Sequence, residues 1–528
     1  MPAVLFSFLK TRWLLLLVFV VFICFKIPQL HYPFYIDEGW VYAPAVKMMA
    51  LHGPSLMPGA IAPELSRGHP LMFHFLCATW IRCFGMSNAA IHSFPLMLSV
   101  IFLIALFECS LKLFGNRVAT IILLLVPTQV IFFVQSSFVY PEIMVAMFAF
   151  LSLYCYSRDY LLLTSLMLFV LFFTKEGGLV FGAVIGVDAV VAMFRRNESI
   201  ARRLSRVAAV VVPTVLIGLF YVAQKATLGW YVLPEHQNLI KSDWYGYYGM
   251  FKCGLYWTDR GDRAMCVLVF FAILLSLIPA VRLKNIRYLF LVPAVIVVYS
   301  QGTMWPEKAT GSVLWMALYL LSFSMPVYYI LQLSRNMSAA GRKFILLMGI
   351  GVPAFLLYSS LTQIGYRYLM VDIIFILIFL AVCIDAYTTA ESNYLFYGAV
   401  CGVMLIGGYG FYSNERTEDC QLGSFQVMNV QMHEIAYLEK SNAYDQEIAY
   451  GCTWEKERFT DTLQGFLSSG RALKNMVRFP VRPSAEYAIF GNSCGDLDDY
   501  RQMLHNPGFH TVYKIRDGKI WAEIFKRN

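Results

Sequence analysis

The sequence predicts a polytopic α-helical membrane protein with a small soluble α/β domain at its C-terminal end. Of its 528 residues, 59% are hydrophobic and only 14% are charged, whereas a soluble protein of this length exposes far more charge. Apolar runs close to the roughly 20 residues needed to cross a bilayer recur along the chain. These runs stop near residue 412, and the share of charged residues then rises. We therefore expect a membrane domain over residues 1–411 and a second domain over residues 412–528.

Thirteen apolar runs are expected to cross the membrane. The first run follows Lys10 and Arg12 and is not followed by a small-residue cleavage site, so we expect an uncleaved span with a cytoplasmic N-terminus. The runs centre near residues 20, 100, 126, 149, 167, 186, 215, 272, 294, 322, 352, 377 and 402.

A fourteenth apolar segment, residues 71–84, is shorter and contains His74 and Arg82. If this segment does not cross, the connections rich in Lys and Arg fall on the cytoplasmic side, as the positive-inside rule requires. If it crosses, nearly all of them fall outside. We therefore expect it to lie along the surface or to re-enter the membrane. In the first external loop before it, residues 41–51 have the apolar spacing of an amphipathic helix on the membrane.

This topology gathers rare ionisable residues on the external side. Charge at the ends of apolar helices is costly to hold near lipid, so such a cluster indicates a functional site. A transporter more often places such groups at mid-membrane, and the pattern therefore favours chemistry at the surface. The residues are Asp37, Glu38, His69, Glu142, Lys175, Glu176 and Arg367.

Each of these residues also has a plain structural explanation. Asp37 and Glu38 can belong to a solvated loop, and His69 can be an ordinary loop residue. Glu142 opens a span, where a carboxylate suits the helix dipole. The adjacent Lys175-Glu176 can simply pair with each other.

Several segments share an order and spacing that resemble a known superfamily. They are Ile36-Asp-Glu-Gly-Trp40, Gly68-His-Pro-Leu-Met72, Trp80-Ile-Arg-Cys-Phe-Gly85, Leu113-Phe-Gly-Asn-Arg117, Val139-Tyr-Pro-Glu-Ile143 and Phe173-Thr-Lys-Glu-Gly-Gly178. Together they resemble the N-terminal half of the dolichyl-phosphate-mannose protein mannosyltransferase superfamily. That superfamily includes the bacterial aminoarabinose transferases and shares the C-type glycosyltransferase membrane fold. The later Ile364-Gly-Tyr-Arg-Tyr-Leu-Met370 is similar to the Arg-Tyr-Leu that opens a late span in the bacterial proteins.

The resemblance implies a membrane glycosyltransferase domain over residues 1–411 with an external active site. A sugar on a lipid phosphate is transferred, with inversion, to an acceptor hydroxyl. The first-loop acid of the family falls on Asp37, the proposed catalytic base, and the adjacent Glu38 is the second catalytic candidate. Glu142 falls where the family usually has Asp. Lys175 and Arg367 are the best candidates to stabilise the leaving polyprenyl phosphate.

Further external residues complete the predicted substrate site. His69 stands where some relatives have Lys or His, and Glu176 begins a Glu-Gly where the family has Gly-Pro. His236 lies in an aromatic-rich loop that suits either sugar stacking or a membrane-interface belt. Tyr368 flanks Arg367. Certain relatives use a divalent metal, which makes Glu142, His69 and His236 candidate metal ligands.

The C-terminal domain is expected to be external and α/β. Residues 426–440 and 496–505 are predicted to be helical, and residues 486–490 alternate like a strand. Residues 511–525 are predicted to form a β-hairpin with its turn at Asp517-Gly518. An oxidising compartment would allow a disulfide. The candidate cysteines are Cys253, Cys420, Cys452 and Cys494.

The competing prediction is a lipid-linked glycan transporter or flippase. It requires polar residues inside the spans, where only Glu108, Asp188 and Asp385 were found. Nothing in the composition indicates nucleic-acid binding. The expected partners are membrane lipids, a polyprenyl-phosphate-linked sugar donor, and an acceptor that is a protein, a lipid or a glycan. The inserted sugar-binding repeats of the eukaryotic enzymes are not recognised in the chain, which favours a bacterial inner membrane with the site facing the periplasm.

Overall fold

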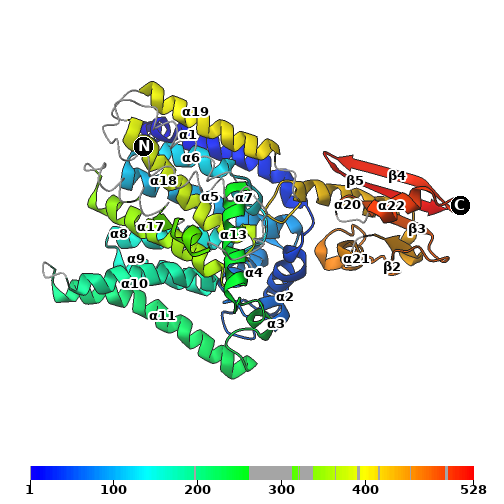
Figure 1. Cartoon of the computed structure of the whole chain (residues 1–528), viewed down its shortest axis with the longest axis horizontal. Helices are drawn as coiled ribbons and strands as arrows, with labels where there is room; N and C mark the ends of the chain where they lie inside the picture. Colours follow the sequence, from blue (N-terminus) through cyan, green and yellow to red (C-terminus); the bar gives the residue numbers. More distant parts are fainter. Residues whose placement is uncertain are drawn as a thin grey trace.

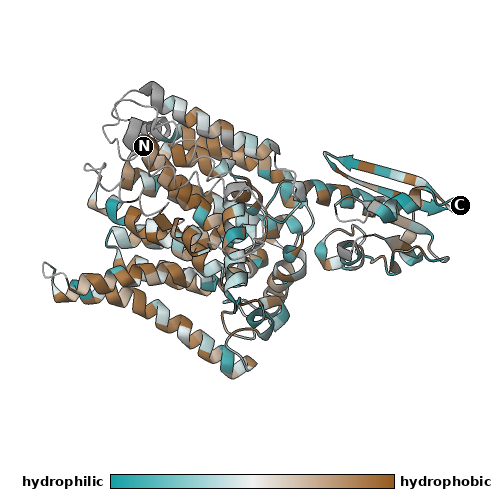
Figure 2. Ribbon diagram, in the orientation of Figure 1, coloured by the Kyte–Doolittle hydropathy of each residue, from teal (hydrophilic) through white to brown (hydrophobic). Residues whose placement is uncertain are grey.

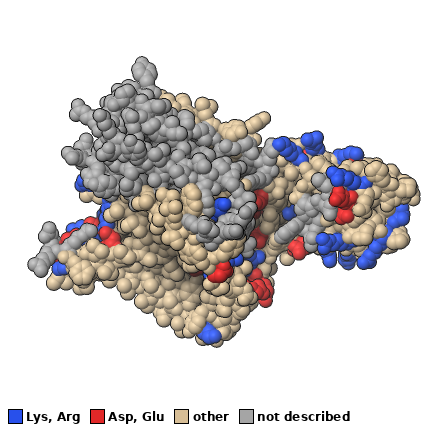
Figure 3. Space-filling model, viewed as in Figure 1, with Lys and Arg blue, Asp and Glu red and all other residues tan. Residues whose placement is uncertain are grey.

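The computed structural model consists of an apolar helical body and a smaller lobe that contains the C-terminus (Figure 1). Figure 2 shows that hydrophobic residues dominate the body, and Figure 3 shows charged side chains spread over the lobe. The structure describes residues 2–194, 198–260, 312–318, 320–321, 327, 337–362, 364–388, 393–413, 417–451, 453–493 and 497–528.

Six segments of the described chain are long and apolar enough to cross a membrane, so the protein is a polytopic helical membrane protein. They are Arg12–His31, Asn88–Phe114, Glu176–Met193, Ile200–Leu228, Ala339–Ser359 and Tyr366–Asp385. The runs predicted near residues 272, 294 and 322 lie outside the described residues, and the total of thirteen spans stays a prediction.

The helices of the body follow the predicted apolar runs. They are α1 (Pro2–Lys26), α5 (Asn88–Phe114), α6 (Asn116–Leu125), α7 (Val130–Gln135), α8 (Glu142–Ser157), α9 (Leu161–Thr174), α10 (Leu179–Met193), α11 (Ile200–Leu228), α17 (Ala339–Ser359), α18 (Met370–Thr388) and α19 (Asn393–Ser413). The loop after α11 contains α12 (Pro234–Gln237) and α13 (Trp244–Arg260).

The first loop folds into short helices, listed as η1 (Ile27–His31), η2 (Glu38–Tyr42), α2 (Ala43–His52), α3 (Pro63–Ser66) and α4 (Met72–Phe84). The helix predicted for residues 41–51 is thus present in η2 and α2. With 13 residues, α4 spans about 20 Å, less than the roughly 30 Å of a bilayer core. It packs against α2, α5 and α9. This length agrees with the expected surface or re-entrant position.

Helix α18 lies at the centre of the body and positions the site. It packs against α6, α8, α17 and α19. Of the residues in the most apolar stretch of Tyr366–Asp385, 89% are buried. Between Asp372 and Asp385 the sequence of α18 is apolar throughout, as expected for a helix buried all round. The short helix η6 (Tyr366–Leu369) precedes it and carries Arg367. One end of the most buried helix therefore holds a cation.

The lobe contains a five-stranded sheet in the order β2-β1-β3-β5-β4. Strand β1 is parallel to β2 and β3, whereas β5 is antiparallel to β3 and β4. Helix α20 packs on β4 and β5. The elements are α20 (Gly423–Lys440), β1 (Ile448–Tyr450), α21 (Thr453–Thr460), η8 (Thr462–Gln464), β2 (Met476–Arg478), β3 (Tyr487–Gly491), α22 (Leu497–Leu504), β4 (Phe509–Asp517) and β5 (Ile520–Arg527).

The hairpin predicted for residues 511–525 is present as β4 and β5. Asp517 pairs with Ile520, which leaves Gly518 and Lys519 as a two-residue turn. Gly518 has φ +59°, a backbone conformation that glycine adopts without strain. The predicted helices and the strand of this lobe are also present, as α20, α22 and β3.

The lobe docks on the first loop through its main chain. Phe34 N donates to Gln464 O at 2.9 Å, and Lys47 Nζ donates to Leu463 O at 3.0 Å. The Arg458 guanidinium lies 5.0 Å from the centroid of the Tyr35 ring. The two parts of the chain therefore meet at the segment that precedes Asp37.

Two of the four cysteines proposed for disulfides, Cys253 and Cys420, are buried. Both sit in apolar surroundings, where cysteine packs as a small hydrophobe. Cys452 and Cys494 lie outside the described residues. Disulfide pairing among the four stays a prediction.

Close packing of α9 on α10 depends on a small residue. A Cβ at Gly182 would lie 2.2 Å from the Phe172 ring, so we expect Gly182→Ala to destabilise the body by about 1–3 kcal/mol. Thermal unfolding in detergent measures this effect. Gly218→Ala in α11 is the matched control, because among the described residues no atom outside the local helix backbone lies within 4 Å of its Cβ position. Equal unfolding temperatures for the two variants would contradict the packing argument.

Candidate functional site

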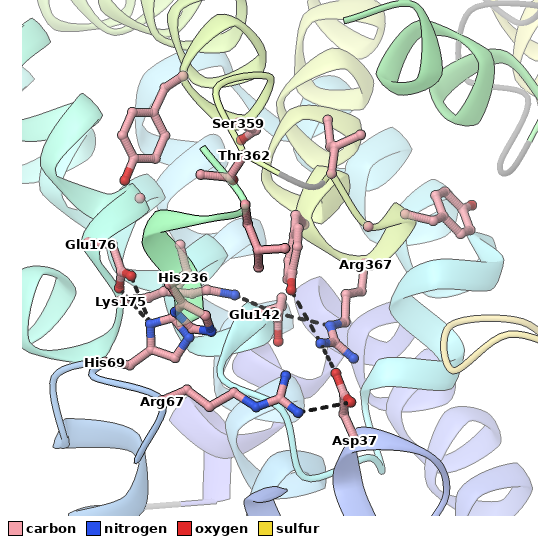
Figure 4. Close-up of a pocket in the computed structure, with 18 of the residues that line it drawn as sticks. Asp37, Arg67, His69, Glu142, Lys175, Glu176, His236, Ser359, Thr362 and Arg367 are labelled. Atoms are coloured by element: carbon pink, nitrogen blue, oxygen red, sulfur yellow. Dashed lines mark hydrogen bonds and ion pairs between the residues drawn. The ribbon is translucent and has the colours of Figure 1, made fainter. Parts of the chain in front are cut away.

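A cavity of about 620 Å³ opens at one end of the helical body. The first loop, the starts of α8 and α10, helix α12, the end of α17, η6 and the segment before α20 all contribute to its wall. Figure 4 shows their side chains converging on this space. The structure brings together all of the predicted site residues except Glu38: Asp37, His69, Glu142, Lys175, Glu176, His236, Arg367 and Tyr368.

Arg367 lies at the centre of this charge cluster. Its Nη2 donates to Asp37 Oδ2 at 2.6 Å, its Nη1 pairs with Asp419, and its Nε is 3.6 Å from Glu142 Oε1. The guanidinium carbon lies 4.6 Å from the centroid of the Tyr140 ring. The side chain is only 8% exposed, so these contacts replace the water that the cation loses on burial.

Asp37 is held between two arginines on the cavity wall. Besides Arg367, Arg67 Nη2 lies 3.6 Å from Asp37 Oδ1. Burial favours the neutral acid, but Arg367, Arg67 and Lys175 outweigh it and lower the pKa of Asp37 below its ordinary value. Asp37 is therefore ionised at neutral pH and can accept a proton.

A second ion pair lies across the cavity, where Lys175 Nζ donates to Glu142 Oε1 at 2.8 Å. The same ammonium lies 3.9 Å from the centroid of the Tyr368 ring. The other oxygen of Glu142, Oε2, is buried and has no hydrogen-bond partner among the described residues. Glu142 thus lines the cavity and has one buried oxygen that no described residue satisfies.

Two histidines form the third part of the site. His69 Nδ1 lies 2.8 and 2.9 Å from the two oxygens of Glu176. The His69 and His236 rings are 5.4 Å apart between centroids. Burial, with a further contribution from His69, lowers the pKa of His236 to about 4. His236 is therefore neutral at pH 7, with one ring nitrogen as donor and the other as acceptor.

Two cavity residues have left-handed backbone conformations. Ile36 has φ +48° immediately before Asp37, and Arg67 also has φ +48°. This conformation is rare for a β-branched residue such as Ile36 and costs of the order of 1–3 kcal/mol. Backbone strain of this kind is characteristic of functional sites, where a side chain must be held in one orientation.

The structure corrects the assignment of Glu38 as catalytic. Its side chain is fully buried and does not line the cavity. Its carboxylate accepts from Tyr35 N at 3.1 Å and from Val139 N at 2.7 Å, and lies 2.9 Å from His92 Nε2. Asp37 and Glu38 are neighbours in the chain, yet the backbone turns one toward the cavity and the other into the protein. Glu38 holds the loop in place.

Three charged residues of the cavity wall were not predicted from the sequence: Arg67, Glu418 and Asp419. Arg67 stands two residues before His69 in the chain. Asp419, with its neighbour Glu418, lies in the junction between α19 and α20. Burial, supported by the charges of Asp37 and Glu142 and opposed by Arg367, raises the pKa of Asp419. An acidic pair just after the last apolar run was the available signal.

The proposed metal ligands line the same cavity but are not arranged around one point. Among the described residues, no three His, Cys, Asp or Glu side chains form a group that could hold a metal ion. Glu142 is paired with Lys175, and His69 with Glu176. The set Glu142, His69 and His236 is therefore not a metal site in this structure.

The comparisons with known proteins identify the fold. No family profile matches the chain, and no curated protein matches its sequence. The chain is similar to the crystal structure of ArnT from Cupriavidus metallidurans bound to undecaprenyl phosphate, with a TM-score of 0.50 at 14% identity. That match covers 97% of this chain and 98% of ArnT. The sequence resemblance is thus confirmed at the level of the fold, which is the C-type glycosyltransferase membrane fold.

Two further structures are similar at lower TM-scores. The apo form of the same ArnT is 13% identical and has a TM-score of 0.48, with 98% of each chain covered. The archaeal oligosaccharyltransferase AglB from Archaeoglobus fulgidus, in complex with an inhibitory peptide and a dolichol-phosphate, is 12% identical and has a TM-score of 0.43. That match covers 91% of this chain and 69% of AglB.

The buried carboxylate of Glu38 provides a test of how the loop is held. We expect Glu38→Gln to destabilise the protein by about 1–3 kcal/mol, because the amide offers only one oxygen to three donors and presents its own N–H₂ to one of them. Thermal unfolding is the measurement. Glu64→Gln changes an exposed acid of the same loop and is the control. A Glu38→Gln protein as stable as the control would show that the loop does not depend on this carboxylate.

Proposed function

We propose that the protein is an integral-membrane inverting glycosyltransferase that moves a sugar from a polyprenyl-phosphate donor to an acceptor hydroxyl. The observation that carries this proposal is the ionised Asp37 on the wall of a cavity that also contains Arg67, Lys175 and Arg367. A base and a set of cations in one enclosed space suit a reaction that removes a proton and releases a phosphate.

The proposed reaction uses Asp37 as general base. Its free oxygen lone pairs take the proton of the acceptor hydroxyl while the acceptor oxygen forms a bond to C1 of the sugar. The bond between C1 and the phosphate oxygen breaks, and both electrons leave with the polyprenyl phosphate. Attack from the face opposite the leaving group inverts the configuration at C1. Lys175, Arg367 and Arg67 stabilise the charge on the departing phosphate.

Two features of the cavity support a polyprenyl-phosphate donor. Part of its wall is apolar and formed by Val232, Leu239, Ile240, Phe355 and Val371, which suits a hydrocarbon chain. The structurally similar ArnT was crystallised with undecaprenyl phosphate. We assign the phosphate to the cationic end of the cavity and the start of the lipid to this apolar wall.

The remaining polar residues are assigned to the sugar and the acceptor. We assign the Glu142 carboxylate to a sugar hydroxyl, because Glu142 lines the cavity and a turn of its side chain toward the sugar would give the unsatisfied Oε2 a partner. The neutral His236 can donate or accept, and the pair of His69 and Glu176 fixes the wall beside it. Tyr368 forms a flat apolar surface next to Lys175, of the kind on which sugar rings stack.

We further propose that residues 1–411 form the transferase domain and residues 412–528 an external domain. The cavity would face the periplasm of a bacterial inner membrane. The acceptor is a protein, a lipid or a glycan. The acids inside the spans support transfer over transport, because Glu108, Asp188 and Asp385 pair with Arg12, Lys343 and Arg117 at 2.6, 3.2 and 3.1 Å. Asp372 is the exception, since its buried carboxylate has no hydrogen-bond partner among the described residues.

The first experiment is a transfer assay with purified protein. Wild type and Asp37→Asn receive a panel of radiolabelled polyprenyl-phosphate sugars with lipid, peptide and glycan acceptors, and release of free lipid phosphate is followed. We expect Asp37→Asn to lower the rate by about 10²–10⁴-fold, the usual contribution of a general base, in a protein that remains folded and membrane-inserted.

The matched control is Asp445→Asn, which changes an aspartate that is 79% exposed in the C-terminal lobe. It should retain wild-type transfer. Near-normal activity of Asp37→Asn would remove Asp37 as the base. If folded wild-type protein cleaves no donor with any acceptor, the transporter becomes the better explanation.

The orientation of the site is tested by labelling at Ser87. This residue caps the N-terminus of α5 just after α4, and its side chain accepts from Ala90 N. If α4 does not cross the membrane, a Ser87→Cys variant should react with an impermeant thiol reagent only from the periplasmic side. The parent chain, which has exposed Cys24, Cys83 and Cys401, gives the background. Reaction from the cytoplasmic side alone would reverse the proposed orientation of every later loop.

A further inference from the structure

Asp419 contacts the catalytic region from outside the membrane helices. It lies in the junction between α19 and α20, six residues after the last apolar helix. Its carboxylate pairs with Arg367 Nη1, and its side chain is 15% exposed, toward the cavity. Arg367 Nη2 is at the same time 2.6 Å from Asp37. One guanidinium therefore joins the proposed base to the segment that leads into the C-terminal lobe.

The junction is anchored by main-chain contacts. Gln135 Nε2 in α7 donates to the backbone oxygen of Asp419 at 3.0 Å. The Tyr35 hydroxyl donates to the backbone oxygen of Thr417. Neither contact uses the Asp419 carboxylate. The position of the segment is therefore fixed independently, and the carboxylate is left to act on Arg367.

More carboxylates approach Arg367 than its single positive charge can neutralise. Asp37, Glu142 and Asp419 all approach this one cation, whereas Glu142 has a second partner in Lys175. A guanidinium offers several N–H groups in fixed directions, so a carboxylate on Nη1 determines where Nη2 points. The groups that face Asp419 from the surrounding elements are Asp37, Glu142, Arg367, Tyr35 and Tyr140.

We propose that Asp419 is a positioning residue for glycosyl transfer, through which the C-terminal part of the chain completes the site. By holding Nη1, it keeps Arg367 where Nη2 can serve Asp37 and the donor phosphate. As an anion beside Arg367, it also weakens binding of the phosphate and so favours release of the lipid product. The proposal rests on the proposed transferase function.

Removing the Asp419 carboxylate should lower the catalytic rate and at the same time strengthen binding of the lipid phosphate. In Asp419→Asn, Arg367 loses one of its anchors and moves toward Asp37, so we expect kcat to fall roughly 10- to 100-fold. One negative charge is also removed from the phosphate site, so the protein should bind undecaprenyl phosphate roughly tenfold more tightly. A residue with a merely structural role would weaken binding or leave it unchanged. Asp419→Glu restores the charge and should recover part of the rate.

The experiment measures transfer kinetics, binding of undecaprenyl phosphate and thermal unfolding for full-length wild type, Asp419→Asn, Asp419→Glu and the control Asp445→Asn. A lower kcat with tighter lipid-phosphate binding in Asp419→Asn, in a protein that thermal unfolding shows to be folded at the assay temperature, supports the proposal. An unchanged kcat, or weaker or unchanged binding, overturns it. If wild type transfers no sugar, the transferase function fails, and the binding comparison still decides whether Asp419 opposes an anion at Arg367.

Discussion

The structure of the site depends on a single buried cation, Arg367. Removing a guanidinium from water costs several kcal/mol unless partners replace the lost hydration. Here the partners are three carboxylates and the face of Tyr140. They come from the first loop, the start of α8 and the junction after α19. The requirement to neutralise one side chain therefore holds together parts of the chain that are far apart in sequence, and it does so at the cavity wall.

Two adjacent acids of the first loop, Glu38 and Asp37, point in opposite directions and have different roles. Glu38 is directed inward, where two backbone N–H groups and His92 meet its carboxylate. Asp37 is directed outward, toward Arg367 and Arg67. The left-handed conformation of Ile36 precedes this change of direction. The buried hydrogen bonds of the Glu38 carboxylate offset the free-energy cost of that conformation. The loop therefore holds Asp37 in one orientation.

Hydropathy predicted the helical body because the bilayer length and the positive-inside rule are constraints on sequence itself. It placed Asp37, Glu142, Lys175 and Arg367 at one end of the helices, and the structure brings them together. It could not distinguish Asp37 from Glu38, because only the backbone conformation at Ile36 decides which acid faces the cavity. It also missed Asp419, because an acid in a charged junction looks like any solvated loop residue until Arg367 is seen beside it.

Charge balance limits how this cavity can bind an anion. Its acids are Asp37, Glu142, Glu176, Glu418 and Asp419, against the cations Arg67, Lys175 and Arg367 and the histidines. A phosphate adds negative charge where Arg367 and Lys175 already have carboxylate partners, so it competes with those carboxylates for the same N–H groups. In the proposed reaction Asp419 stays on Nη1 of Arg367, and its charge opposes the phosphate before and after transfer. The site therefore binds the lipid phosphate less tightly than its cations alone would, and this favours release of the product.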